Sequence, residues 1–112
     1  MALAHLNPNV VIDLSALGPL LPDHKTYTLF KSEQLEVLRL VLPAGKVIAE
    51  HKAPGEITVH CLEGRIVFTA AGKTHELAAG QMLYLTAGVP HALESLEDAT
   101  VLVTLAVKPK SL

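Results

Sequence analysis

GKVIAEHKAPGEITVHCLEG, residues 45–64, is the stretch that decides the fold. Two short runs of strand-forming residues flank a Pro-Gly turn signal, and a glycine stands at each end of the stretch. The runs carry His51, Glu56 and His60, whose side chains can bind a metal or exchange a proton. This pattern predicts two short strands that present a small polar group.

A second stretch, residues 80–95, repeats the theme as GQMLYLTAGVPHALES, with a glycine, an apolar run, a turn and His91. Between these stretches and through them, glycines recur every 8 to 10 residues, at positions 45, 55, 64, 72, 80 and 88. Short strands at that interval, each bounded by turn residues, are typical of an all-β sandwich or barrel. No long window keeps a 3.6-residue period, so we expect an all-β fold with few or no helices.

The composition restricts the class of protein. The 112 residues suffice for one domain with a real core. Hydrophobic residues make up 50% of the chain, charged residues 18%, and the formal net charge is −2, which is too apolar for disorder and too near neutral for a nucleic-acid binder. The longest uncharged run, residues 77–93, is broken by glycines and a proline and is shorter than the roughly 20 apolar residues of a membrane span. We expect neither nucleic acid nor membrane as a partner.

The N-terminal residues and the cysteine content favour a cytoplasmic protein. No basic region precedes the first apolar residues, and Pro8 and Asp13 interrupt them, which argues against a secretory signal. Cys61 is the only cysteine, so the chain has no internal disulfide, as expected in a reducing compartment. Because Cys61 lies in an alternating apolar run, we expect a buried side chain and not a nucleophile.

We predict one domain in two parts. Residues 1–34 form an N-terminal segment with a short strand, and residues 35–112 form the barrel. The N-terminal segment is apolar and punctuated by turn residues, so it can cover its own domain or lie across a partner subunit. The half-apolar composition with few charges favours a homodimer, with residues 1–34 as a candidate interface.

The two histidine stretches resemble the two sequence motifs of the cupin superfamily, the RmlC-like cupins, whose small β-barrels hold a ligand or a metal inside the barrel. The resemblance covers about residues 35–107 and implies a double-stranded β-helix, or jelly-roll barrel. The positions that keep the family spacing are Gly45, His51 and Gly64 in the first motif and Gly80, Gly88 and His91 in the second.

The first motif departs from the family pattern at two positions that bear on metal binding. Ala53 stands where the family has a second histidine, and Ile57 stands where it has a glutamate. The resemblance therefore implies that His51 and His91 are ligands of a divalent metal such as Zn, Fe, Mn or Ni. The alternative is that the barrel holds no metal. Catalytic metal sites use three or four converging protein ligands, which is more than these two.

Strand register decides whether further ligands join them. Because side chains alternate across a strand, an offset of one residue sends a side chain to the opposite face. The count to Gly64 favours a register with Glu56 and His60 outside the barrel. A bulge near the Pro-Gly turn would instead bring both inward to join His51 and His91. In the favoured register the inward set is Ile57, Val59 and Cys61.

Three functions stay open. The leading interpretation is a small cupin that binds a small molecule, with or without a metal, in the barrel mouth near His51 and His91. The second, implied by the resemblance, is a metal-dependent oxygenase or isomerase in which the metal polarises a substrate oxygen. The third is a non-catalytic oligomeric scaffold or regulatory subunit that associates through the N-terminal segment and an outer sheet face. No catalytic residue can be named from the sequence.

Overall fold

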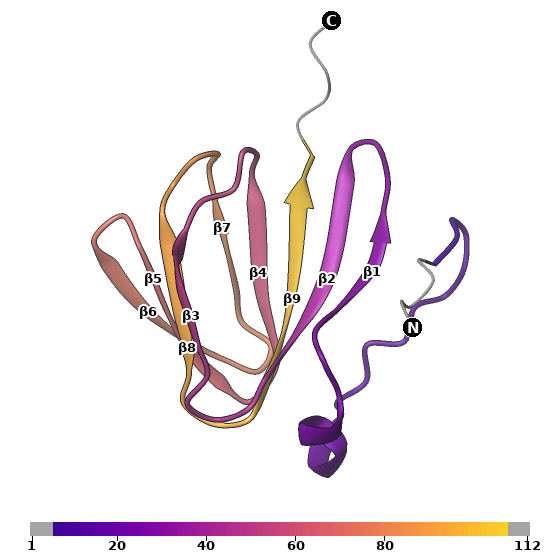
Figure 1. The fold of residues 1–112 in the computed structure, drawn as a ribbon, viewed down its shortest axis with the longest axis horizontal. Helices are drawn as coiled ribbons and strands as arrows, with labels where there is room; N and C mark the ends of the chain where they lie inside the picture. Colours follow the sequence, from indigo (N-terminus) through magenta and orange to yellow (C-terminus); the bar gives the residue numbers. More distant parts are fainter. Residues whose placement is uncertain (1–5, 108–112) are drawn as a thin grey trace, which may run out of the picture.

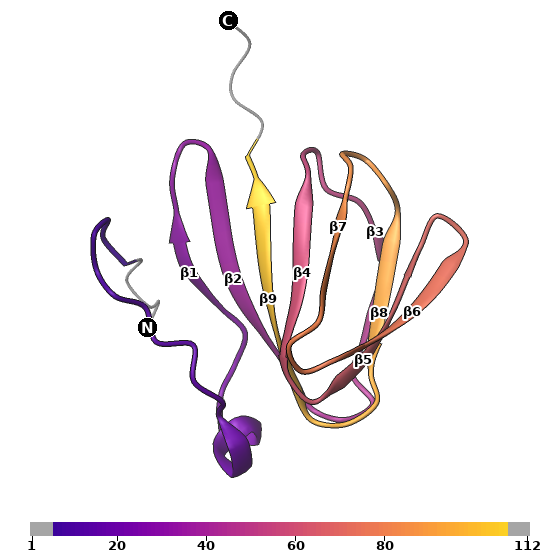
Figure 2. The same ribbon diagram turned by 180° about the vertical axis from the view of Figure 1, so that it is seen from behind.

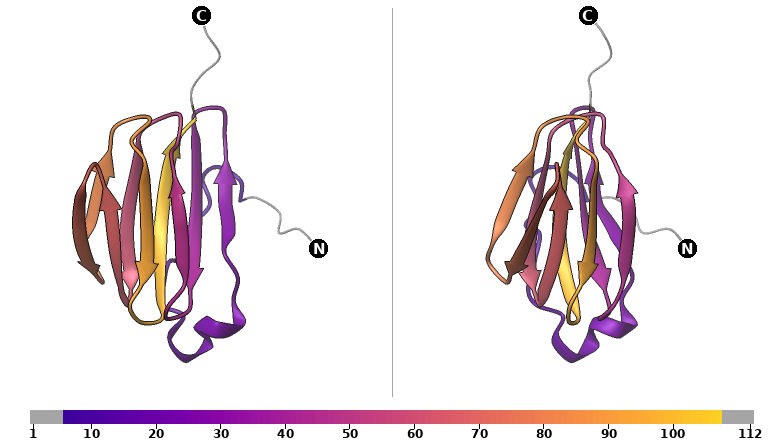
Figure 3. Two further views of the ribbon diagram at one scale, coloured as in Figure 1. Left: turned by 60° about the vertical axis from the view of Figure 1, so that its left-hand side comes forward. Right: turned by 90° about the vertical axis from the view of Figure 1, so that its left-hand side faces the viewer.

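The computed structural model describes residues 6–107, which form two antiparallel β-sheets packed face to face (Figures 1 and 3). The predicted N-terminal segment and barrel both extend beyond these residues. Within them lie one short 3-10 helix and nine strands. The elements are η1 (Gly18–Asp23), β1 (Tyr27–Lys31), β2 (Leu35–Leu42), β3 (Val47–His51), β4 (Ile57–Glu63), β5 (Arg65–Ala70), β6 (Lys73–Ala78), β7 (Met82–Leu85), β8 (His91–Ser95) and β9 (Ala99–Ala106).

The sheet topology places strands side by side that are far apart in the sequence. The larger sheet has five strands in the order β1-β2-β9-β4-β7, and the smaller has four in the order β3-β8-β5-β6. The N-terminal part of the chain supplies β1, which pairs with β2 and joins the larger sheet. The predicted all-β jelly-roll fold is confirmed. No helix within the described residues is long and apolar enough to cross a membrane.

Alternation along the strands sorts side chains between the barrel interior and its surface. In β4, Ile57, Val59 and Cys61 are almost fully buried, with 3%, 1% and 0% of their surface exposed. The intervening Thr58 and His60 are only partly buried. This strand therefore has the register that the sequence count to Gly64 favoured, and Cys61 is a buried, free thiol.

The barrel is filled at one end and open at the other. Figure 1 shows the two sheets meeting at their lower ends and diverging toward their upper ends, and Figure 2 shows the same from behind. At the closed end, Ser95 joins two loops, because its hydroxyl donates to the Pro43 carbonyl at 2.6 Å and accepts from the Lys46 amide at 3.0 Å. The core at this end consists of Leu42, Cys61, Ile66, Leu77, Ala99 and Val101.

The outer face of the larger sheet carries a buried ion pair, which lies against the N-terminal segment. Arg39 of β2 is 1% exposed and forms an ion pair at 3.1 Å with Glu63 of β4. The Glu63 carboxylate also accepts from the hydroxyl of Thr100 at 2.7 Å and from the amides of Leu17 and Gly18 at 2.9 and 3.0 Å. These bonds fix the chain just before and at the start of η1 on the sheet.

Candidate functional site

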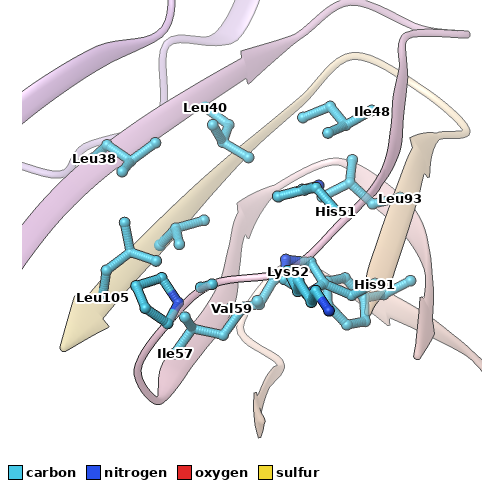
Figure 4. A pocket seen from close by; sticks show the side chains of 14 residues that line it. Leu38, Leu40, Ile48, His51, Lys52, Ile57, Val59, His91, Leu93 and Leu105 are labelled. Carbon is cyan, nitrogen blue, oxygen red and sulfur yellow. The ribbon is translucent and has the colours of Figure 1, made fainter. Parts of the chain in front are cut away.

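A cavity of about 400 Å³ occupies the open end of the barrel between the two sheets (Figure 4). Leucine, isoleucine, valine, phenylalanine, alanine and proline make up most of its lining. The wall from the larger sheet consists of Leu38, Leu40, Ile57, Val59, Val103 and Leu105. The opposite wall and the adjoining loop supply Ile48, His51, Lys52, Ala53, Pro54, Phe68, His91 and Leu93.

Within residues 6–107, three lining residues carry side-chain nitrogen, and they lie on the β3 and β8 side. His51 ends β3, His91 begins β8, and the two are paired across the sheet. Their ring centroids lie 4.3 Å apart in an edge-on arrangement, and His91 stacks on Phe68 of β5 at 5.6 Å. Figure 4 shows His51, Lys52 and His91 on one side of the cavity and Leu38 and Leu105 on the other. The cavity therefore has a polar edge and an apolar wall.

A β-bulge aims His51 into the cavity. Ile48 pairs with Leu93 and His51 pairs with His91, so three steps along β3 match two along β8. In a regular strand Ile48 and Glu50 would share a face, whereas here Ile48 and His51 both line the cavity. The bulge lies within β3, upstream of the Pro-Gly turn where the sequence suggested one.

Both imidazoles are oriented by the backbone. The Nδ1–H of His51 donates to the Ala49 carbonyl oxygen at 2.9 Å, and the Nδ1–H of His91 donates to the Val89 carbonyl oxygen at 2.9 Å. A carbonyl oxygen only accepts, so Nδ1 carries the proton and Nε2 of a neutral ring keeps its lone pair. Within residues 6–107 neither Nε2 has a protein hydrogen-bond partner. Both are free for a ligand.

The other two predicted ligands lie away from this pair. Glu56 is exposed just before β4, where its backbone carbonyl accepts from the Ala106 amide at 2.9 Å. His60 lies on the outer face of β4, paired with Met82 of β7 and Leu102 of β9. The structure thus brings His51 and His91 together and leaves Glu56 and His60 outside the cavity.

The two departures from the first cupin motif both line the cavity. Ala53 follows the bulged strand and Ile57 begins β4, and each contributes apolar surface where the family pattern has a histidine or a glutamate. The side chains that would complete a metal site are therefore replaced in place by apolar ones. Their replacement is one reason that the lining is so apolar.

Sequence reasoning missed two residues of the site. One is Lys52, which directly follows His51; regular alternation along a strand would place the two side chains on opposite faces, yet both line the cavity. Phe68 and Ile66 are both buried in β5, but the sequence gives no sign that the Phe68 ring stacks on His91. That contact depends on the pairing of β5 with β8.

The sequence comparison identifies the family. Residues 38–108 match the family model of the cupin domain, so the chain belongs to the cupin domain family. No curated protein matches the sequence.

Solved structures agree with this assignment. A conserved protein of unknown function from Streptococcus pyogenes is 27% identical, with a TM-score of 0.73 over 99% of this chain and 100% of that one. A cupin superfamily protein from Desulfitobacterium hafniense is 16% identical, with a TM-score of 0.74 over 96% of this chain and 100% of that one. The DMSP lyase DddQ from Ruegeria pomeroyi is 24% identical, with a TM-score of 0.68 over 78% of this chain and 48% of that one. The last two likenesses concern the fold alone.

Proposed function

We propose that this chain is a small-molecule-binding cupin whose ligand occupies the apolar cavity, with His51 and His91 at the polar end. The observation that carries the proposal is the cavity itself, about 400 Å³ of open volume in a barrel whose other end is filled. Small-molecule sites are clefts of about 300–1,000 Å³, mostly apolar, with a few placed polar groups. An apolar ligand body would remove leucine and valine surface from water, which is favourable.

A neutral fluorescent probe tests this proposal. We expect N-phenyl-1-naphthylamine to bind saturably with a dissociation constant near micromolar, about −8 kcal/mol. The variant Leu38→Phe/Leu105→Phe fills the cavity and should abolish binding. The matched control Thr58→Phe/Thr104→Phe adds the same rings to the outer face of the same sheet and should bind normally. Equal binding by the filled variant would contradict the proposal and leave the scaffold interpretation.

The donor set decides how a metal enters this proposal. Within residues 6–107 no group of three or more His, Cys, Asp or Glu side chains is placed to hold a metal ion. A catalytic zinc site provides three protein ligands, and His51 and His91 are two. These residues do not fit a resident catalytic Zn, Fe, Mn or Ni. We propose binding without a resident metal.

Elemental analysis of the untagged protein, prepared without chelator, tests that proposal. We expect substoichiometric metal both in the natural chain and in the variant His51→Ala/His91→Ala. Metal at about one per chain that is lost in the variant would contradict it, and would support the second candidate, a metal-dependent oxygenase or isomerase.

We also propose that the chain forms a homodimer. Met82 and Tyr84 of β7 are 55% and 61% exposed on the outer face of the larger sheet, and Val10 and Val11 are exposed on the N-terminal segment. Such apolar surface favours association. Light scattering after size exclusion should give twice the 11.9 kDa chain mass, and a monomer at micromolar concentration would contradict the dimer.

A cytoplasmic location is the last part of the proposal. The lone, buried thiol of Cys61 is compatible with a reducing compartment. Cell fractionation should recover the protein with the cytosolic fraction, and recovery from culture medium or membranes would contradict this location.

A further inference from the structure

We propose that the ligand of the cavity is an apolar molecule with a single anionic head group, an alkyl or aryl carboxylate, and not a sugar or another polyhydroxylated molecule. This inference rests on the proposed function and adds the chemical class of the ligand. Three features of the cavity carry it: the lack of side-chain oxygen in the lining, the position of Lys52, and the orientation of the two imidazoles.

Of the residues that the structure describes, no serine, threonine, tyrosine, asparagine, glutamine, aspartate or glutamate lines the cavity. A sugar hydroxyl that enters such a cavity exchanges its hydrogen bonds to water for apolar contacts. Each unsatisfied polar group in a buried position costs about 1–3 kcal/mol. For a sugar with several hydroxyls, the free energy lost with these hydrogen bonds would exceed the free energy gained from apolar contacts. An alkyl chain or an aromatic ring has no hydrogen bonds to water to lose on entry.

Among the described residues, Lys52 is the one lysine or arginine of the lining. It is exposed at the end of β3, beside the polar edge of the cavity. None of the ion pairs within the described residues involves it, and the lining contains no carboxylate that could neutralise it. Lysine keeps its ammonium in water while its stem covers apolar surface. An anionic head group at the rim would meet this charge without being desolvated completely.

The imidazoles add two hydrogen-bonding groups to the same edge. Nδ1 of His51 and Nδ1 of His91 each bond a backbone carbonyl, and both residues line the cavity, so Nε2 is the ring nitrogen that remains for a ligand. An imidazole nitrogen accepts a hydrogen bond from a hydroxyl or water when it is unprotonated and donates one to a carboxylate when it is protonated. The polar edge therefore gathers one ammonium group and two imidazoles around a single head group, and the rest of the lining is apolar.

The apolar body extends from this edge toward the opposite wall. Leu38, Leu40 and Leu105 line that wall on the larger sheet. At about 30 Å³ per water molecule, the cavity holds the volume of roughly 13 waters, enough for an apolar body of roughly a dozen non-hydrogen atoms. Decanoate is of this size and serves as the probe.

Displacement of N-phenyl-1-naphthylamine tests the inference with three competitors below their aggregation limits: decanoate, decan-1-ol and glucuronate. Decanoate should displace the dye more strongly than decan-1-ol, and glucuronate should not displace it. The variant Lys52→Met keeps the apolar stem and removes the charge, and should weaken decanoate roughly tenfold or more while leaving decan-1-ol unchanged. The matched control Lys46→Met, at an exposed lysine outside the cavity lining, should behave as the natural chain.

The outcomes separate this inference from the proposed function. Equal binding of decanoate and decan-1-ol, an equal effect of Lys52→Met on both, or displacement by glucuronate would overturn the ligand class while the cavity stays a binding site. A natural chain that binds neither the dye nor any competitor would overturn both.

Discussion

One polar group lies on the outer face of the larger sheet and another on the inner face of the smaller sheet, and they differ in how many protein partners each one has. On the outer face, Arg39 and Glu63 form an ion pair that the N-terminal segment covers. On the inner face, the ring centroids of His51 and His91 lie 4.3 Å apart, and both residues line the cavity. The N-terminal segment covers the first group, whereas the second group lines the cavity.

The outer group shows what several hydrogen-bond partners do to a carboxylate, although Nε of Arg39 is buried without a hydrogen-bond partner among the described residues. Burial by itself raises the pKa of Glu63. The amide of Leu17, the hydroxyl of Thr100, the amide of Gly18 and the charge of Arg39 each lower it, and together they outweigh burial, so the pKa lies below its ordinary 4.5. The carboxylate is thus held in its charged form as part of the fold.

The difference between the two groups separates a stabilising role from a binding role. A buried charge with several protein partners is costly to disturb, because its partners would be left without it. An oriented imidazole with a free nitrogen at a cavity edge costs the fold little and remains available to a ligand. We expect substitutions in the outer group to change stability and substitutions in the inner group to change binding.

The largest expected effect is the loss of stability in Glu63→Gln. The change leaves the buried guanidinium of Arg39 without a counter-charge, and we expect the free energy of unfolding to fall by about 3–5 kcal/mol. Urea denaturation measures it. Glu76→Gln is the matched control, because Glu76 forms an exposed pair with Arg65 at 3.5 Å and should cost about 0–1 kcal/mol. Similar losses of stability in the two variants would show that the buried pair stabilises the fold no more than the exposed pair does.

The second prediction concerns a variant that adds two metal ligands beside the histidine pair. Ala53→His/Ile57→Glu places an imidazole and a carboxylate at lining positions beside His51 and His91. We expect Ni²⁺ or Zn²⁺ to bind at least about tenfold more tightly than to the natural chain, a gain of about 1.4 kcal/mol by calorimetry. The control Ala53→His/Thr58→Glu puts the carboxylate on the outer face and should gain less. Equal gains would mean that position 57 does not face the site.

The third prediction concerns acid. Because the folded pKa of Glu63 lies below the ordinary value of 4.5, its contribution to stability is present above about pH 4.5 and is lost as pH falls through the lower folded value. The natural chain should therefore lose stability more steeply below pH 4.5 than Glu63→Gln does. Urea midpoints at a series of pH values measure this, and parallel curves would contradict the assignment.

The smallest expected effect is that of His51→Gln on stability. His51 is exposed at the cavity rim and contributes one local hydrogen bond, to Ala49. We expect the free energy of unfolding to change by no more than about 0.5 kcal/mol. A loss above about 2 kcal/mol would place His51 among the stabilising residues and remove the contrast with Glu63.

Much of the fold could be predicted from local sequence signals. The glycine spacing gives the strand rhythm, and the count from His51 to Gly64 gives the correct register of β4, so that Glu56 and His60 lie outside. The bulge between Ile48 and His51 could not be predicted, because no residue type marks it. Neither could the Arg39 and Glu63 pair, which joins residues 24 positions apart through the packing of separate strands.

The candidate site was predicted in part. The two histidines were identified by their place in the motifs, and the structure brings them together. The apolar character of the cavity depends on which side chains from six different strands converge, and Lys52 joins them from the loop after β3. Such convergence is a property of the tertiary structure.

The most direct test of the cavity as a binding site is an NMR titration of the methyl-labelled protein with N-phenyl-1-naphthylamine, with the histidine rings observed at the same time. We predict that the methyl signals of Leu38, Val103 and Leu105 and the ring signals of His51 and His91 shift together and saturate at one dye per chain. Shifts confined to the outer face, at Met82 and Leu102, with the cavity signals unmoved, would contradict the account.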